Sequence, residues 1–170
     1  MNEKQLIHSS RKGDREAFAK LYGLYKDRLY RYAYYRLGNS CDAEDAVCDT
    51  VLMAFEEIRD LRKASAFSAW IFRMHYSTCS KYVARQIDVR ESANIDDYEN
   101  SAKLSTTINT LSAELNEGLN ILTDHEREVV LLSVIAGFNS REISEITGLT
   151  DGSVRCKLSR SLEKMRNFLE

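Results

Sequence analysis

Apolar residues recur at steps of three and four, the period of an α-helix, over most of the first half of the chain. Three such runs occupy residues 14–38, 42–58 and 67–85. Each run would collect its apolar side chains on one face of a helix, for example Val47, Val51, Ala54, Phe55 and Ile58 in the second run. The pattern therefore predicts three amphipathic helices that bury one shared core.

The ends of these helices carry their own signals. A short helix over Leu6–Lys12 should stop at Gly13, and Asp14 is placed to cap the long helix that follows. Gly38 and Asn39 should end that long helix.

The last third of the chain predicts a second set of helices. Thr123-Asp124-His125-Glu126 has the form of a capping box ahead of an apolar run that stops at Gly137. Ser140 is placed to cap a short helix, Arg141–Thr147, which ends at Gly148, and Thr150 to cap a long one from Asp151 to about Leu169. A short helix, a glycine turn and a longer helix are typical of a helix-turn-helix unit.

Composition supports an all-α protein of two small helical domains joined by a flexible linker. The 170 residues include no proline and only 7 glycines. Residues 88–110 are acidic at first and then rich in Ser, Thr and Asn, with sparse apolar residues. We therefore expect domains over residues 1–87 and 111–170, with a linker over residues 88–110.

Several classes of protein are excluded by the sequence. No apolar stretch approaches the roughly 20 residues needed to span a bilayer, and the N-terminus has no apolar signal segment, so we expect a cytoplasmic protein. The four cysteines form no CxxC pair, and the histidines do not cluster with them, which argues against zinc. No nucleophile–base pair or phosphate loop is present. We expect no enzyme, no cofactor and no small-molecule substrate.

The net charge of −2 conceals an uneven distribution. Residues 153–166 hold five basic residues against one acid, Glu163, in the predicted last helix. On a helical wheel, Val154, Leu158, Leu162 and Met165 form the buried stripe, and the opposite face and its edges carry Arg155, Cys156, Lys157, Ser159 and Arg160. Such a face suits the major groove of DNA, although any amphipathic helical hairpin has a polar outer face.

Two further surfaces stand out in the N-terminal half. The outward face of the 42–58 helix combines acids with two apolar residues, a pattern that fits a docking face for a basic protein helix as well as a solvated surface: Asp42, Asp45, Asp49, Leu52, Met53 and Glu56. The third helix and the segment before it interleave aromatic rings with cations, which suits unpaired bases. Trp70 fits a core position and a base-stacking position equally well.

At this point the sequence resembles the extracytoplasmic-function (ECF) group of bacterial RNA polymerase sigma factors. The motifs that carry the resemblance follow one another in the family's order: Asp14-Arg15-Glu16-Ala17-Phe18, Asp42-Ala43-Glu44-Asp45-Ala46-Val47, Phe67-Ser68-Ala69-Trp70-Ile71-Phe72-Arg73-Met74, Leu122-Thr123-Asp124-His125-Glu126-Arg127-Glu128-Val129 and Gly152-Ser153-Val154-Arg155. Together they extend over nearly the whole chain apart from the linker.

The resemblance implies a role for each surface. The N-terminal domain would bind the coiled coil of the polymerase β′ subunit through Asp45, Cys48, Asp49, Leu52 and Met53. Melted −10 DNA would be bound by Arg59, Leu61, Arg62, Lys63, Trp70, Arg73 and Tyr76. The C-terminal domain would contact the β flap and read the −35 element through Arg141, Arg155, Cys156, Lys157, Ser159, Arg160 and Lys164. The resemblance also implies an anti-sigma partner, often at the membrane.

Two other interpretations stay open at the level of sequence. A helix-turn-helix regulator would bind DNA without joining the polymerase as an initiation subunit. A thiol-based redox sensor would use one of the cysteines, of which Cys156, between Arg155 and Lys157, is the best placed to be reactive.

Overall fold

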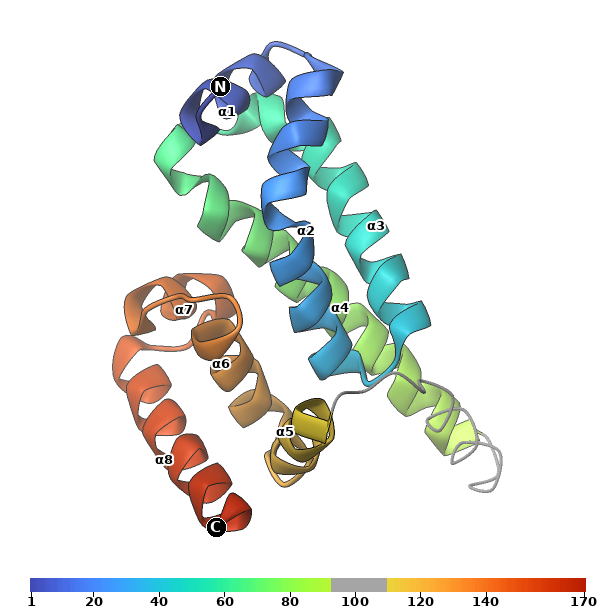
Figure 1. Ribbon diagram of the computed structural model, residues 1–170, viewed down its shortest axis with the longest axis vertical. Helices are drawn as coiled ribbons and strands as arrows, with labels where there is room; N and C mark the ends of the chain where they lie inside the picture. The colour runs from blue at the N-terminus through green and yellow to red at the C-terminus, as the bar shows by residue number, and fades with distance from the viewer. Residues whose placement is uncertain (93–109) are drawn as a thin grey trace.

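The computed structural model describes residues 1–92 and 110–170, and every regular element in these ranges is a helix (Figure 1). The α-helices are α1 (Glu3–Arg11), α2 (Arg15–Leu37), α3 (Ser40–Glu57), α4 (Phe67–Ser92), α5 (Thr110–Asn120), α6 (Asp124–Val134), α7 (Ser140–Thr147) and α8 (Asp151–Leu169). Two short 3-10 helices, η1 (Ile58–Asp60) and η2 (Ala64–Ala66), lie between α3 and α4. The predicted all-α fold is confirmed.

Helices α1–α4, which we call the N-terminal module, pack around one core. The three predicted amphipathic helices are present as α2, α3 and α4, and α2 contacts both of the others. Leu21, Leu29 and Tyr32 of α2 are fully buried with Phe67 and Phe72 of α4. Their burial removes the apolar faces from water, and this is the main force that holds the module together.

Two predicted caps of α2 are present. The carboxylate of Asp14 accepts a hydrogen bond from the backbone N–H of Ala17 at 3.1 Å. Gly38 ends the helix at a φ of 81°, a left-handed conformation that glycine adopts without steric cost.

Helix α4 is longer than the sequence pattern predicted. We expected it to reach about Arg85, with a linker from residue 88, whereas the helix continues to Ser92. Nothing in the segment Gln86–Ser92 stops a helix, because it contains neither glycine nor proline. The expected linker therefore begins with helix, and its residues 93–109 lie outside the described part of the chain.

Helices α5–α8, which we call the C-terminal module, form the second group, with α8 packed against α5, α6 and α7. Thr123 caps α6 as predicted, since its hydroxyl accepts from the N–H of Glu126 at 3.3 Å. The predicted cap of α7 was wrong by one residue: Asn139 is the cap, and it exchanges hydrogen bonds with Glu142 in a complete capping box. Ser140 is the first residue inside that helix.

The buried stripe of α8 also differs from the prediction. Val154 and Met165 are buried and Leu158 is half-buried, as expected, but Leu162 is exposed and Ser161 is fully buried in its place. On the C-terminal side of this stripe α5 approaches closely, and a Cβ at Gly118 would lie only 3.2 Å from Cε of Met165. A glycine at this point of α5 therefore allows the two helices to meet.

The two modules are in contact through α4 with α7 and α2 with α6 (Figure 1). The rings of Phe72 and Phe138 meet edge to face across this boundary, with centroids 5.1 Å apart. None of the described helices is long and apolar enough to cross a membrane.

Candidate nucleic-acid interface

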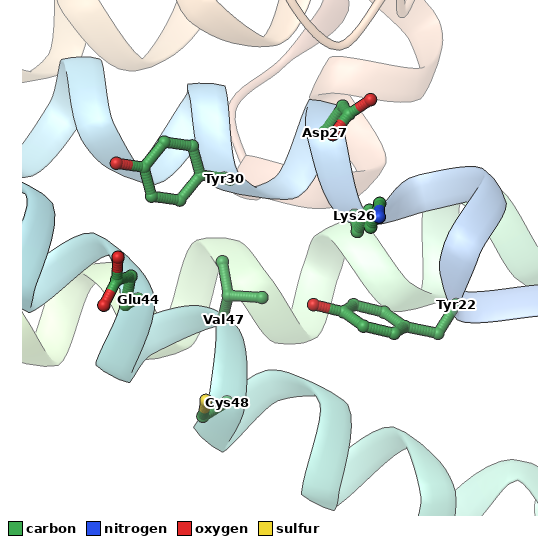
Figure 2. A pocket seen from close by; sticks show the side chains of 7 residues that line it. All are labelled: Tyr22, Lys26, Asp27, Tyr30, Glu44, Val47 and Cys48. Carbon is green, nitrogen blue, oxygen red and sulfur yellow. The ribbon is translucent and has the colours of Figure 1, made fainter. Parts of the chain in front are cut away.

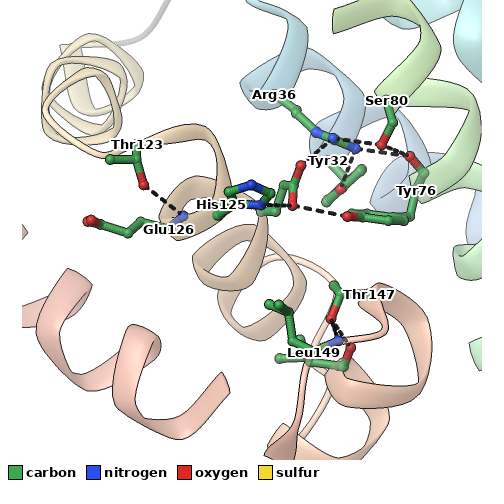
Figure 3. A network of polar contacts seen from close by, with 11 residues as sticks. Tyr32, Arg36, Tyr76, Ser80, Thr123, His125, Glu126, Thr147 and Leu149 are labelled. Atoms are coloured by element: carbon green, nitrogen blue, oxygen red, sulfur yellow. Dashed lines mark hydrogen bonds and ion pairs between the residues drawn. The ribbon is translucent and has the colours of Figure 1, made fainter. Parts of the chain in front are cut away.

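The helix-turn-helix is built from α7 and α8. Ile143 and Ile146 of α7 and Val154 of α8 are buried, and they hold the two helices together. The turn between them is fixed by short side-chain contacts: Thr147 accepts from the N–H of Leu149 at 3.3 Å (Figure 3), and Ser144 donates to the carbonyl of Leu149 at 2.5 Å. Gly148 adopts a φ of 81° at the end of α7. These contacts fix the angle at which α8 leaves the turn.

The N-terminal half of α8 exposes the basic and polar residues predicted to face DNA. Thr150 caps the helix by accepting from the N–H of Ser153 at 3.2 Å, so the first turn is well formed. The side chains of Arg155, Cys156, Ser159 and Arg160 are exposed, Lys157 is half-exposed, and Arg141 is exposed on α7. Arg155 lies 3.7 Å from Asp151 on the previous turn, a solvent-exposed pair that costs little to separate.

Lys164, the last residue of the predicted −35 set, has a different environment. Its ammonium donates to both carboxylate oxygens of Glu126, at 3.0 and 3.1 Å. Glu126 belongs to α6, so this ion pair joins two helices of the C-terminal module. This ion pair favours a structural role for Lys164, and its predicted DNA contact stays a prediction.

The predicted −10 residues fall into two groups. Arg59, Arg62 and Lys63 are exposed on the segment between α3 and α4, where basic side chains are free to meet phosphates. Leu61 in the same segment is buried in the core, so its side chain is not exposed to DNA in this conformation, and its predicted −10 contact stays a prediction. Trp70 is half-buried, and its indole lies 5.7 Å from the ring of buried Phe67.

The remaining two members of that set, Arg73 and Tyr76, contact the C-terminal module. The guanidinium of Arg73 donates to the backbone carbonyl of Glu145 on α7 at 2.9 Å. The hydroxyl of Tyr76 donates to a carboxylate oxygen of Glu128 on α6 at 3.1 Å. Burial and the adjacent Glu128 carboxylate both raise the pKa of Tyr76, so its hydroxyl remains a donor.

The predicted docking face of α3 is exposed. Asp45, Cys48, Asp49 and Leu52 are exposed and Met53 is half-exposed along one side of the helix. Two grooves flank this face. The larger, of about 460 Å³, lies between α2 and α3 and is lined by Tyr22, Lys26, Asp27, Tyr30, Glu44, Val47 and Cys48 (Figure 2).

The second groove, of about 300 Å³, runs between α3 and α4 and includes Asp49, Leu52, Met53 and Tyr82 in its lining. The hydroxyl of Tyr82 donates to the Asp49 carboxylate at 2.7 Å. Burial, together with this hydrogen bond, raises the pKa of Tyr82 to about 12. The hydrogen bond orients one carboxylate of the docking face.

The sequence did not indicate the polar network between the modules (Figure 3). Arg36 of α2 and Glu128 of α6 form an ion pair at 2.5 Å, with side chains that are only 5% and 6% exposed. Their separation of 92 residues leaves no local signal that would pair them.

The four cysteines are free thiols, and the structure separates them by accessibility. Cys41, Cys48 and Cys156 are exposed, whereas Cys79 is buried. Burial raises the pKa of the Cys79 thiol to about 12, which keeps it protonated and unreactive.

Comparison with known proteins identifies both modules. Residues 21–87 match the family model for Sigma-70 region 2, and residues 112–165 match that for Sigma-70 region 4. The chain is 27% identical to the ECF RNA polymerase sigma factor SigW of Bacillus subtilis, over 98% of this chain and 96% of SigW. It is 24% identical to the ECF RNA polymerase sigma factor BldN of Streptomyces coelicolor, over 97% of this chain but only 65% of BldN.

A solved structure shares the fold. CnrH, in complex with the cytosolic domain of CnrY, superposes with a TM-score of 0.74 over 98% of this chain and 96% of CnrH, at 21% identity. The two family matches lie in the order region 2 then region 4 and together account for most of the sequence. The chain therefore belongs to the ECF group of the sigma-70 family, the RNA polymerase subunits that select promoters.

Proposed function

We propose that this protein joins core RNA polymerase and directs it to promoters by contacting DNA at two places, without catalysing a reaction itself. The observation that carries the proposal is the presence, in one chain, of three separate exposed surfaces with the chemistry of three contacts. These are the acidic and apolar face of α3, the basic segment before α4, and the basic face of α8. A chain that only bound DNA would need one of them.

The α3 face would bind a basic helical element of the polymerase, which the family resemblance identifies as the β′ coiled coil. Asp45 and Asp49 supply negative charge, and Leu52, which is 62% exposed, supplies apolar surface and lines the second groove together with Asp49. A centre of apolar surface with charges at its rim is the usual composition of a protein–protein interface. The alternative, a regulator that never joins the polymerase, would use its N-terminal domain for dimerisation and would not need an acidic face suited to a basic helix.

The two DNA contacts would be divided between the modules. Arg59, Arg62, Lys63 and Trp70 would meet the melted −10 strand, with cations for the phosphates and an indole for stacking. The face of α8 from Arg155 to Arg160 would read the −35 element in the major groove. We retain residues 1–87 and 111–170 as the two functional domains and residues 88–110 as their connection.

The partners follow from this role. Core polymerase would contact the α3 face and, at its β flap, the C-terminal domain, and promoter DNA would be the second partner. We also propose an anti-sigma protein, which the complex of CnrH with the cytosolic domain of CnrY supports. All these partners place the working protein in the cytoplasm, at the inner face of the membrane when the anti-sigma protein is anchored there.

The test is reconstituted transcription. Promoters are first found by sequencing the 5′ ends of transcripts that appear when the protein is overproduced. The purified protein with core polymerase should then start RNA at the same positions, and core alone should not. If the protein with core polymerase initiates at none of the promoters identified in this way, the proposal is overturned. DNA binding without stable binding to core would favour the regulator.

A further inference from the structure

Helix α1 lies against the basic segment that precedes α4. It packs on η1 and η2, at the end of the N-terminal module where α3 ends and α4 begins (Figure 1). Leu6 and Ile7 on its inner side are buried, and the Tyr25 hydroxyl of α2 donates to the Glu3 carboxylate near the start of α1. These contacts hold the helix beside the segment that carries the proposed −10 cations.

The outer side of α1 and the turn after it are basic. Lys4 and Arg11 are seven residues apart, so they lie within about 20° of each other around the helix axis. Lys12 and Arg15 follow, at the end of α1 and the start of α2. Arg11 is half-exposed, and the other three side chains are exposed. We call these four residues the α1 basic face.

Gly13 joins this face to the −10 segment. A Cβ at Gly13 would lie only 3.1 Å from Nη2 of Arg59, so the Arg59 guanidinium rests on the turn between α1 and α2. Lys12 directly precedes this point of contact, and Arg15 follows it by two residues. Arg59 and the α1 basic face therefore form one continuous positive surface.

The charge balance of this surface differs from that of the whole chain. Residues 1–15 and 59–63 together contain seven Lys and Arg residues against three acids, whereas the whole chain contains 24 against 26. Two of the three acids are directed elsewhere, since Glu3 accepts from Tyr25 and Asp14 accepts from the backbone N–H of Ala17. A cluster of cations on one face of a chain that is negative overall fits a nucleic-acid backbone.

We propose that the α1 basic face binds phosphates of the promoter strand that continues beyond the −10 element. The inference rests on the proposed function, since it extends the −10 surface. The face is none of the three surfaces assigned above, and residues 1–20 precede the part of the chain that matches Sigma-70 region 2. Residues 1–15 contain no Phe, Tyr or Trp to stack on a base. The face therefore adds affinity without sequence preference.

Two pairs of substitutions give a matched comparison. Arg11→Gln with Lys12→Gln removes two charges from the α1 basic face. Lys26→Gln with Arg31→Gln removes two charges from exposed positions of α2, about three turns or more beyond Arg15, and serves as the control. Glutamine has nearly the helix propensity of Lys and Arg, so both pairs should unfold within a few degrees of the wild type.

The test uses holoenzyme and a labelled promoter fragment with a preopened −10 region, so that binding does not depend on melting. Affinity is measured at several salt concentrations. A single-stranded phosphate contact contributes about 0.7 to the slope of log affinity against log salt, so two lost contacts should reduce the slope by about 1.4. At about 0.1 M salt, binding should weaken roughly tenfold for matched and scrambled −10 sequences alike. The control pair should keep the wild-type slope.

Two results would overturn the inference: a wild-type slope for Arg11→Gln with Lys12→Gln, or a loss confined to the matched −10 sequence. If this first pair unfolds, Lys4→Gln with Arg15→Gln, at the two ends of the face, takes its place. Vesicles of phosphatidylglycerol provide another polyanion. Binding to vesicles that the first pair loses, with an unchanged DNA slope, would assign the face to a membrane and also overturn the inference.

The transcription assay with the wild type decides the proposed function separately. A wild type that initiates at the mapped promoters, together with an unchanged slope for the first pair, would remove only the α1 contact. A wild type that initiates at none of them would overturn the proposed function, whatever the slopes show.

Discussion

The imidazole of His75 on α4 lies 2.8 Å from the hydroxyl of Thr50 on α3, inside the N-terminal core. Its other nitrogen, Nε2, lies 2.7 Å from the carbonyl oxygen of Leu29, which only accepts, so Nε2 carries the hydrogen. Nδ1 of the neutral ring is then an acceptor, and it shares the single hydrogen of the Thr50 hydroxyl with the carbonyl of Ala46, which lies 2.8 Å from that hydroxyl. One histidine thus joins three helices, α2, α3 and α4, and does so without charge.

This environment predicts a loss of stability in acid. Burial, with a smaller contribution from the nearby Arg36 charge, lowers the pKa of His75 to about 4, against 6.5 for a solvated histidine. Between these two values the unfolded chain takes up a proton that the folded chain does not, so the free energy of unfolding falls as pH falls from about 6.5 to about 4. The full effect is about 3 kcal/mol.

Urea unfolding followed by the fluorescence of Trp70, the single tryptophan, should measure this loss. Between pH 7 and pH 5 the wild type should lose about 2 kcal/mol more than His75→Gln, which cannot titrate at this position. The carboxylates titrate in both proteins, so the comparison isolates His75. Equal losses would show that the ring is not held neutral.

Asn139 provides a test of local stability in the helix-turn-helix. Asn139→Ala removes the hydrogen bond that the Asn139 side chain accepts from the backbone N–H of Glu142 at 2.9 Å, and it leaves the reciprocal bond from the Asn139 backbone N–H to the Glu142 carboxylate. The loss of this cap should lower the free energy of unfolding by about 1 kcal/mol. Ser140→Ala, one residue along, should change it far less, because no cap depends on that side chain. Thermal unfolding should show a larger loss of stability for Asn139→Ala than for Ser140→Ala. The opposite order would mean that Ser140 is the true cap.

Arg160 and Lys164 should differ in their effect on promoter choice. Arg160→Ala should reduce discrimination between matched and scrambled −35 elements by about 1–3 kcal/mol, if the guanidinium reads a base edge. Lys164→Ala should leave discrimination and the salt dependence of binding unchanged and lower stability by less than about 1 kcal/mol, since its ammonium pairs with Glu126 at a partly exposed site. Competition between promoters with holoenzyme made from each variant distinguishes the two roles. A flatter salt dependence for Lys164→Ala would restore its assignment as a phosphate contact.

Charge reversal on α3 should weaken the association with core polymerase. Asp49→Lys removes the acceptor of the Tyr82 hydroxyl and places a cation on the docking face, so the affinity for core should fall at least about tenfold. Glu16→Lys reverses an exposed acid on α2 that pairs with the neighbouring Lys20 at 3.7 Å, and it serves as the control. Binding of each variant to immobilised core polymerase measures the difference. If both variants bind as the wild type does, Asp49 is outside the interface.

Thiol labelling separates a redox sensor from a passive set of cysteines. In the folded protein at pH 8, iodoacetamide should label Cys41, Cys48 and Cys156 and leave Cys79 unlabelled until the chain unfolds. Mass spectrometry locates the labels. Cys156 is the cysteine on the proposed DNA-facing surface, so the redox-sensor interpretation then depends on it. Unchanged promoter binding after mild oxidation would contradict that interpretation.

Local features of the fold were predictable from sequence because their causes are local. Asp14, Gly38, Gly148 and Thr150 act within one turn of the chain, and all four occupy the predicted helix ends. The cap of α7 was misplaced because Asn139 and Ser140 are both good capping residues, and only Asn139 has Glu142 three positions later.

The buried stripe of α8 shows how a helical-wheel prediction can select the wrong buried residue. At 100° per residue, Ser161 lies about 20° from Val154 and Leu162 about 80° away, at the edge of the stripe. The prediction placed Leu162 in the buried stripe because leucine is the more hydrophobic residue. In the structure Ser161 is buried instead, because it lies at the centre of the stripe, where a small side chain fits beside Glu126. Geometry outweighs side-chain type when the helices pack closely.

The polar contacts between helices could not be predicted from the sequence. Arg36, His75 and Glu128 are charged or titratable residues in buried positions, where such residues are uncommon without partners. The contacts that link them to other helices span 25 to 92 positions, and no periodic pattern connects these partners. The exposed candidates on α3 and α8, by contrast, follow from helical period and charge alone.

Helix α4 extends without a break from Phe67 to Ser92, and 26 residues of α-helix form a rod about 39 Å long. Its first turns lie beside the basic segment, its middle contacts the C-terminal module, and Gln86 near its end donates to Asp42 at the start of α3. One continuous helix thus connects these three surfaces. A displacement of α3 by the polymerase would be passed along α4 to the surface that we propose captures the opened promoter strand.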